Sequence, residues 1–92
     1  MLVQKALEDQ ESEAHVLISC DLNKEDKVYH ALKDVDGVLD VSNVSGAYDI
    51  VARVKSSTPE SLKHIIVWKI RAMLHVRSTL TLTSTHCHHN VA

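Results

Sequence analysis

The residues with the greatest capacity for chemistry lie at the C-terminal end, which reads Thr85-His86-Cys87-His88-His89. Imidazole and thiolate are ligands of zinc and copper, and His86 and His88 would point the same way if the last strand continued that far. A metal centre usually takes three or four ligands held together, so others would have to come from His15 or from a second subunit. The alternative is a tail with incidental histidines. The stretch is thus a candidate zinc or copper site.

Elsewhere the chain lacks the side-chain sets on which catalysis depends. It offers no nucleophile beside a base, no glycine-rich phosphate loop and no pair of carboxylates on one element. An active site needs a poised acid, base or metal in a pocket. We therefore expect a binding module rather than an enzyme.

Composition narrows the class of protein further. Ten Lys and Arg stand against twelve Asp and Glu, for a formal net charge of −2, with one Trp, two Tyr and no Phe. Nucleic-acid binders carry a basic stripe and aromatic stacking platforms, so direct binding to nucleic acid is not expected. No apolar run approaches the roughly 20 residues of a membrane helix, and two cysteines make no disulfide framework. We expect a cytoplasmic protein without membrane contact.

The elements that would position these residues follow from hydrophobic periodicity. Apolar and polar residues alternate from Ala14 to Cys20, which predicts a strand with Cys20 facing inward. Asn23 offers a cap for a helix that runs to about Asp36, and Gly37 suits its end.

The second half of the chain repeats this pattern. The segments 38–45 and 48–55 predict a hairpin around Gly46-Ala47, with Ile50, Ala52 and Val54 inward. Ser57-Thr58-Pro59-Glu60 combines a hydroxyl cap, a first-turn proline and an acid, as at a helix start. Its apolar stripe extends to Met73 and Leu74, and residues 76–83 alternate as a last strand.

The predicted order is βαββαβ, an α+β fold of the ferredoxin-like type with a four-stranded antiparallel sheet and both helices on one face. We divide the chain into an N-terminal arm or short helix (residues 1–13), one domain (14–84) and the tail (85–92).

The sheet face without helices should be polar in a monomer. If Ile50 faces inward, Leu17 and Val51 face outward, together with one of the pairs Leu39/Val41 or Val38/Val44. The threonines Thr79 and Thr81 are expected on the same outward face. Such a mixed apolar patch predicts a homodimer packed through the two open faces. The alternative is scattered surface apolar residues, which are common.

From Ala14 to Ser84 the chain resembles the effector-binding domain of the Lrp/AsnC transcriptional regulators, the dimeric α/β barrel type of this fold. The resemblance rests on Val44-Ser45-Gly46-Ala47-Tyr48-Asp49-Ile50, on Asp36-Gly37-Val38 and on Val76-Arg77-Ser78-Thr79-Leu80-Thr81-Leu82. Two features depart from the family pattern. Thirteen residues before Ala14 cannot hold the usual DNA-binding helix-turn-helix, and His75 replaces a glycine, so that a different turn geometry is expected there.

This resemblance implies an amino-acid effector bound where dimers meet in a ring. By position it implicates Gly46, Tyr48 and Asp49, with Thr81, Leu82 and Thr83 as weaker matches. Gly46 would let backbone amides approach a ligand carboxylate, and Asp49 would pair with an α-ammonium group. The alternative is structural: Gly46 serves the turn, Tyr48 packs and Asp49 caps the hairpin.

The resemblance also implies partners. A stand-alone member without its own DNA reader would act in amino-acid-responsive regulation, alone or assembled with full-length Lrp/AsnC regulators. Trp68 lies off the apolar stripe and is a candidate contact between dimers. The competing functions are metal binding through the tail and a small enzyme of the dimeric α/β barrel type.

Overall fold

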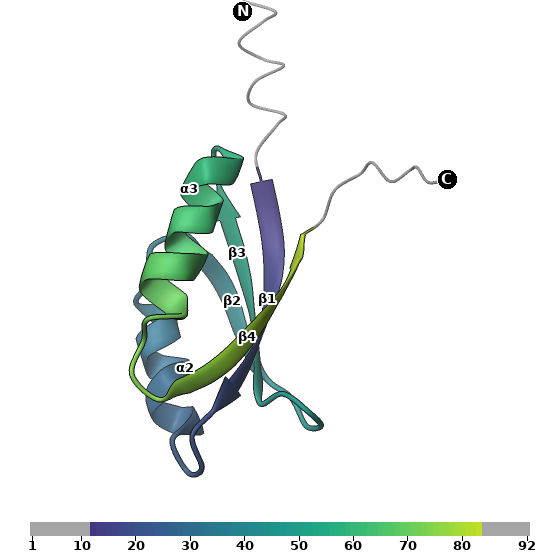
Figure 1. Cartoon of the computed structure of the whole chain (residues 1–92), viewed down its shortest axis with the longest axis vertical. Helices are drawn as coiled ribbons and strands as arrows, with labels where there is room; N and C mark the ends of the chain where they lie inside the picture. The colour runs from purple at the N-terminus through teal and green to yellow at the C-terminus, as the bar shows by residue number, and fades with distance from the viewer. Residues whose placement is uncertain (1–11, 84–92) are drawn as a thin grey trace, which may run out of the picture.

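The computed structural model describes residues 12–83, in which a four-stranded antiparallel sheet carries its helices on one face (Figure 1). The predicted βαββαβ order and the ferredoxin-like fold are confirmed. Along the chain, the elements are β1 (Ser12–Cys20), α2 (Glu25–Lys33), β2 (Val38–Asn43), β3 (Ile50–Ser56), α3 (Pro59–His64), the π-helical segment η1 (Ile65–Ile70) and β4 (Val76–Thr83). The strands lie in the order β2-β3-β1-β4. None of the helices between residues 12 and 83 has the length and apolar character of a membrane span.

The core lies between the sheet and the helices. The inward positions predicted on β1 and β3 are confirmed, and Cys20 belongs to the same layer. These side chains leave water together, which is the main favourable term in folding. The buried residues are Ala14, Val16, Ile18, Cys20, Val28, Leu32, Ile50, Ala52, Val54, Leu62, Ile66 and Ile70.

The start of α2 differs from the prediction. Asn23 is not the cap; Lys24 holds that position without a side-chain hydrogen bond. Asn23 instead has a φ of 65°, a left-handed conformation that asparagine tolerates better than most residues. It is used to turn the chain sharply between β1 and α2.

The end of α2 also comes earlier than predicted, at Lys33 rather than near Asp36. Gly37, with a φ of 99°, serves the turn into β2. A Cβ there would lie 2.8 Å from the Ile65 side chain and 3.2 Å from the Lys55 carbonyl oxygen. Glycine is therefore required for both its backbone conformation and the close approach of α3–η1.

The second helix begins as predicted and ends sooner. The Thr58 hydroxyl accepts a 3.0 Å hydrogen bond from the Ser61 amide, with Pro59 in the first turn. The last turns are π-helical, and the Arg71 amide donates to the Ile66 carbonyl at 2.8 Å. Because the helix ends at Ile70, the prediction that Leu74 belongs to the buried stripe is wrong: Leu74 lies in the following turn and is 76% exposed.

His75 has a φ of 75°, in the left-handed region that glycine adopts more readily than other residues. The different turn geometry expected from this replacement stays a prediction. The Asp21 amide donates to the His75 carbonyl at 2.9 Å, and His75 Nδ1 lies 3.3 Å from Asp21 Oδ2. These contacts join the loop before α2 to the loop before β4.

Candidate functional site

The β2–β3 hairpin carries the three strongest site candidates. Gly46 lies at its exposed tip with a φ of 128°, and nothing lies within 4 Å of where its Cβ would be. Tyr48 and Asp49 follow on the way into β3 and are half-buried. An open glycine tip leaves backbone amides accessible to a ligand.

Asp49 fastens this hairpin to β1. Its Oδ2 accepts a 2.8 Å hydrogen bond from the Cys20 amide, and its own amide donates to the Ile18 carbonyl at 2.9 Å. Its carbonyl accepts a 2.9 Å bond from the Val44 amide. Asp49 thus has a structural role that its sequence position alone does not reveal, because Cys20 is 29 residues away. A contact with a ligand stays a prediction.

Cys20 lies beside Asp49, and its thiol is unreactive. Burial, reinforced by the negative charges of Asp49, Glu25 and Asp21, raises the pKa of the Cys20 thiol to about 11. The reactive form of cysteine is the thiolate, so this side chain acts as a small core residue.

Of the weaker candidates Thr81, Leu82 and Thr83, Thr83 lies at the far end of the sheet, whereas Thr81 pairs with Val16, midway along β1. Thr83 pairs with Ala14, whereas the hairpin joins β3 at Ile50, opposite Ile18. Ala14 lies four residue steps along β1 from Ile18, about 13 Å at the usual rise. Figure 1 shows the hairpin and the end of β4 at opposite ends of the sheet. One chain therefore does not bring the two groups together.

On β4 the open sheet face is more apolar than predicted. Residues paired directly across antiparallel strands share a face. Leu80 pairs with Leu17, and Leu82 pairs with His15, so both leucines lie on the open face. The apolar residues of this face form the patch Leu17, Val51, Leu80 and Leu82.

The prediction that Thr79 and Thr81 lie on this face is wrong. They pair with Ile18 and Val16, on the helix side. The cause is a register shift where Cys20 pairs with Val76, since one extra residue at the start of a strand reverses every later side chain.

A second irregularity, between Val38 and Asp40, changes β2. Val38 and Val41 both pack on the core, whereas Leu39 and Val44 are 49% and 41% exposed. Neither predicted outward pair is therefore correct as a pair, because the bulge breaks the alternation.

Among the described residues, no group of three or more His, Cys, Asp or Glu side chains is arranged to hold a metal. The tail candidates His86, Cys87, His88 and His89 lie outside residues 12–83, and zinc or copper binding by the tail stays a prediction. His15, considered as a further ligand, is exposed on the open face.

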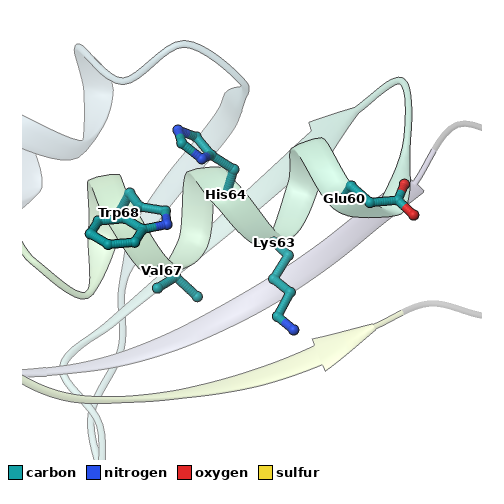
Figure 2. Close-up of a pocket in the computed structure, with 5 residues that line it drawn as sticks. All are labelled: Glu60, Lys63, His64, Val67 and Trp68. Carbon is teal, nitrogen blue, oxygen red and sulfur yellow. The ribbon is translucent and has the colours of Figure 1, made fainter.

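Trp68 is 67% exposed on η1 and lines an open hollow of about 240 Å³. Figure 2 shows its neighbours along α3 and η1: Glu60, Lys63, His64 and Val67. The His64 and Trp68 ring centroids are 6.4 Å apart. Sequence reasoning found the tryptophan through its position off the apolar stripe but missed the hollow.

Comparison with known proteins decides the family. Residues 13–87 match the family described as the Lrp/AsnC ligand binding domain. The chain belongs to this family. As an Lrp/AsnC domain it is a regulatory ligand-binding domain, and its matched range contains both groups of site candidates.

Solved structures agree with this assignment. The chain is similar to the protein FFRP-DM1 (28% identity, TM-score 0.78), covering 80% of this chain and 99% of that one. It is also similar to TTHA0845 from Thermus thermophilus (30% identity, TM-score 0.76), covering 80% of this chain and 92% of that one. AsnC of Escherichia coli, at 22% identity, shares the fold with a TM-score of 0.77 over 87% of this chain and 54% of its own.

The chain is also similar to part of two longer curated proteins. The chain is 38% identical over 80 residues to homocitrate synthase of Saccharolobus islandicus, which covers 86% of this chain and 17% of that protein. Homocitrate synthase of Sulfurisphaera tokodaii is 39% identical over 70 residues, 75% of this chain and 15% of that protein. The chain thus spans about a sixth of the length of these relatives.

Proposed function

We propose that this domain binds a free amino acid at a seam between two copies of the chain and acts in amino-acid-responsive regulation through protein partners, full-length Lrp/AsnC regulators among them. The observation that carries the proposal is the separation of the candidate residues within one chain. Gly46, Tyr48 and Asp49 lie at one end of the sheet, whereas residues 81–83 run from its middle, where Thr81 pairs with Val16, to the other end. A site that uses both groups needs a neighbouring chain.

The dimer that would create such seams packs through the open faces. Helices cover only one side of the sheet (Figure 1), and the patch of Leu17, Val51, Leu80 and Leu82 lies on the other. Leu80 and Leu82 are 44% and 51% exposed. Apolar area of this kind favours association, and a two-fold contact lets one patch cover its copy. Dimers would then join into a ring, with the hairpins at the junctions.

The recognition chemistry follows from the hairpin. Backbone amides near Gly46 suit an α-carboxylate. Asp49 uses Oδ2 to hold Cys20, which leaves its other carboxylate oxygen for an α-ammonium group. A structure of a regulator from Neisseria meningitidis in complex with L-Met, 12% identical with a TM-score of 0.71 over 80% of this chain, makes amino acids the class to test first.

The test separates ligand binding from the structural role of Asp49. The full chain is titrated with each common amino acid by calorimetry, alongside Asp49→Asn, Asp49→Ala and the exposed-loop control Asp36→Asn. The amide oxygen of Asp49→Asn still accepts the Cys20 hydrogen bond but lacks the charge. We expect binding by the parent and by Asp36→Asn, and loss of binding in Asp49→Asn without loss of fold.

Two results would contradict the proposal in different ways. If no amino acid binds the parent, the ligand class is wrong. If Asp49→Asn binds as tightly as the parent, Asp49 has only its structural role.

The homocitrate synthases support a second candidate, control of a biosynthetic enzyme. There a domain 38% identical to this chain forms a small part of an enzyme. In this alternative the amino acid bound by the domain would modulate that enzyme's activity. Cross-linking of the chain in its native cells, followed by mass spectrometry, distinguishes the two: recovery of a helix-turn-helix regulator supports the first candidate, and recovery of an enzyme supports the second.

A further inference from the structure

One arginine lies across the open face and connects three strands. Arg53, on β3, donates through Nε and Nη2 to Asp40 Oδ2 of β2, at 3.1 and 2.8 Å. Its Nη1 donates to Glu13 Oε2 of β1 at 3.1 Å. We call these three residues the Arg53 bridge.

The bridge borders the apolar patch. Arg53 pairs with Asp40 on one side and His15 on the other, and Val51, two residues along β3, pairs with Leu17. The side chains of Arg53 and Glu13 are only 38% and 30% exposed. A partner that covers Val51 and Leu17 therefore meets the bridge as well.

Charge decides what such a partner can be. On β1, β2 and β3 the paired positions of the open face carry two acids, Glu13 and Asp40, and two bases, Arg53 and Lys55. Their formal charges cancel, so these positions do not add repulsion against a second copy of the same face. Because both carboxylates hold Arg53 within its own chain, an approaching copy does not have to supply a counter-ion, whereas an unpaired arginine would be costly to cover.

We propose that the Arg53 bridge selects the partner of the open face: it admits a second copy of this chain and disfavours a chain whose face leaves an arginine or a carboxylate uncompensated. The inference rests on the proposed function, because it takes a second copy as the occupant of the open face. Discrimination of this kind through unmatched charges is a general means of partner choice.

The experiment measures the dimer Kd of the full chain by sedimentation equilibrium. Glu13→Gln with Asp40→Asn leaves Arg53 without a charged partner, and the Kd should weaken about tenfold or more. Adding Arg53→Met removes the stranded charge, and the Kd should return to within about threefold of the parent, because an apolar residue can replace a buried ion pair without net loss. Asp34→Asn with Asp36→Asn is the matched control: it removes two negative charges from an exposed loop and should leave the Kd unchanged.

The salt dependence of the dimer Kd distinguishes a charge effect at the interface from a purely structural role of the bridge. Each face of the double variant carries uncompensated positive charge and therefore repels its copy, so raising the salt from about 50 to about 500 mM should strengthen the dimer of the double variant. The parent dimer should change little. Should the double variant fail to fold, Asp40→Asn alone, at a side chain that is 62% exposed, replaces one of the two carboxylates. Because Glu13 still holds Arg53, a smaller weakening of the Kd is expected, and an unchanged Kd would overturn the bridge.

The outcomes separate the two proposals. A parent that stays monomeric overturns the dimer, and with it the proposed function. A parent that dimerises, with an unchanged Kd in the double variant or no recovery in the triple variant, overturns the bridge alone.

Discussion

If a second copy of the chain covers the open face, the double substitution Leu80→Thr and Leu82→Thr should weaken the dimer Kd strongly. Threonine has the β-branched character that strands favour and removes most of the apolar surface. The two leucines are 44% and 51% exposed in the single chain, and full burial of a leucine contributes about 1.5–3 kcal/mol. Covering the exposed half of each contributes about 1 kcal/mol, and four such side chains per dimer give about 4 kcal/mol, or ~1000-fold in Kd.

Analytical ultracentrifugation across a concentration series measures this change directly. The matched control is Leu22→Thr with Leu74→Thr, because these leucines are 81% and 76% exposed but lie in loops, away from the sheet face. We expect the control to dimerise like the parent. An equal Kd for the Leu80/Leu82 variant and the parent would refute the reasoning.

Three further predictions concern the chain itself. Thr58→Ala removes the cap of α3 and should lower the free energy of unfolding by about 1 kcal/mol in urea titration. The Cys20 thiol has a pKa of about 11 in the folded chain, against an ordinary value of 9.0, so the folded state holds this proton more tightly than the unfolded state. The contribution of Cys20 to the free energy of unfolding is therefore fully present below pH 9 and is lost as the pH rises through 11. Denaturation at several pH values should show that loss in the parent and not in Cys20→Ala. Because His75 has a φ of 75°, His75→Gly should be more stable than His75→Ala by about 1 kcal/mol in thermal unfolding, and equal stability would contradict the assigned strain.

Most of the fold could be predicted because periodicity reports it directly. The alternation in 14–20 and 50–54 identifies the inward faces of β1 and β3, and Thr58-Pro59 marks a helix start by local chemistry alone. Residues 76–83 also alternate, yet the alternation alone assigns their faces wrongly. The register shift that pairs Cys20 with Val76 reverses them, and such a shift depends on a strand more than 50 residues away in the sequence.

The candidate site also has a part that the sequence predicts and a part that it does not. Gly46, Tyr48 and Asp49 are close in sequence, so their proximity in the hairpin could be predicted. The bond between Asp49 and Cys20 and the bridge from Arg53 to Glu13 span 29 and 40 residues. These contacts follow from the pairing of β1 with β3, and a single sequence without that register does not reveal them.

The place of β1 in the sheet has a consequence for how the chain acquires its structure. Among the described strands, β1 comes earliest in the sequence but lies between β3 and β4, so both of its hydrogen-bonded neighbours emerge later during synthesis. Contacts between such distant segments slow folding, because a long loop must close before any pairing is gained. A nascent chain that ends after β3 leaves one edge of β1 without its strand, exposed to aggregation. The domain therefore reaches its stable form only once β4 is made, and a gene truncated before that strand should yield insoluble product.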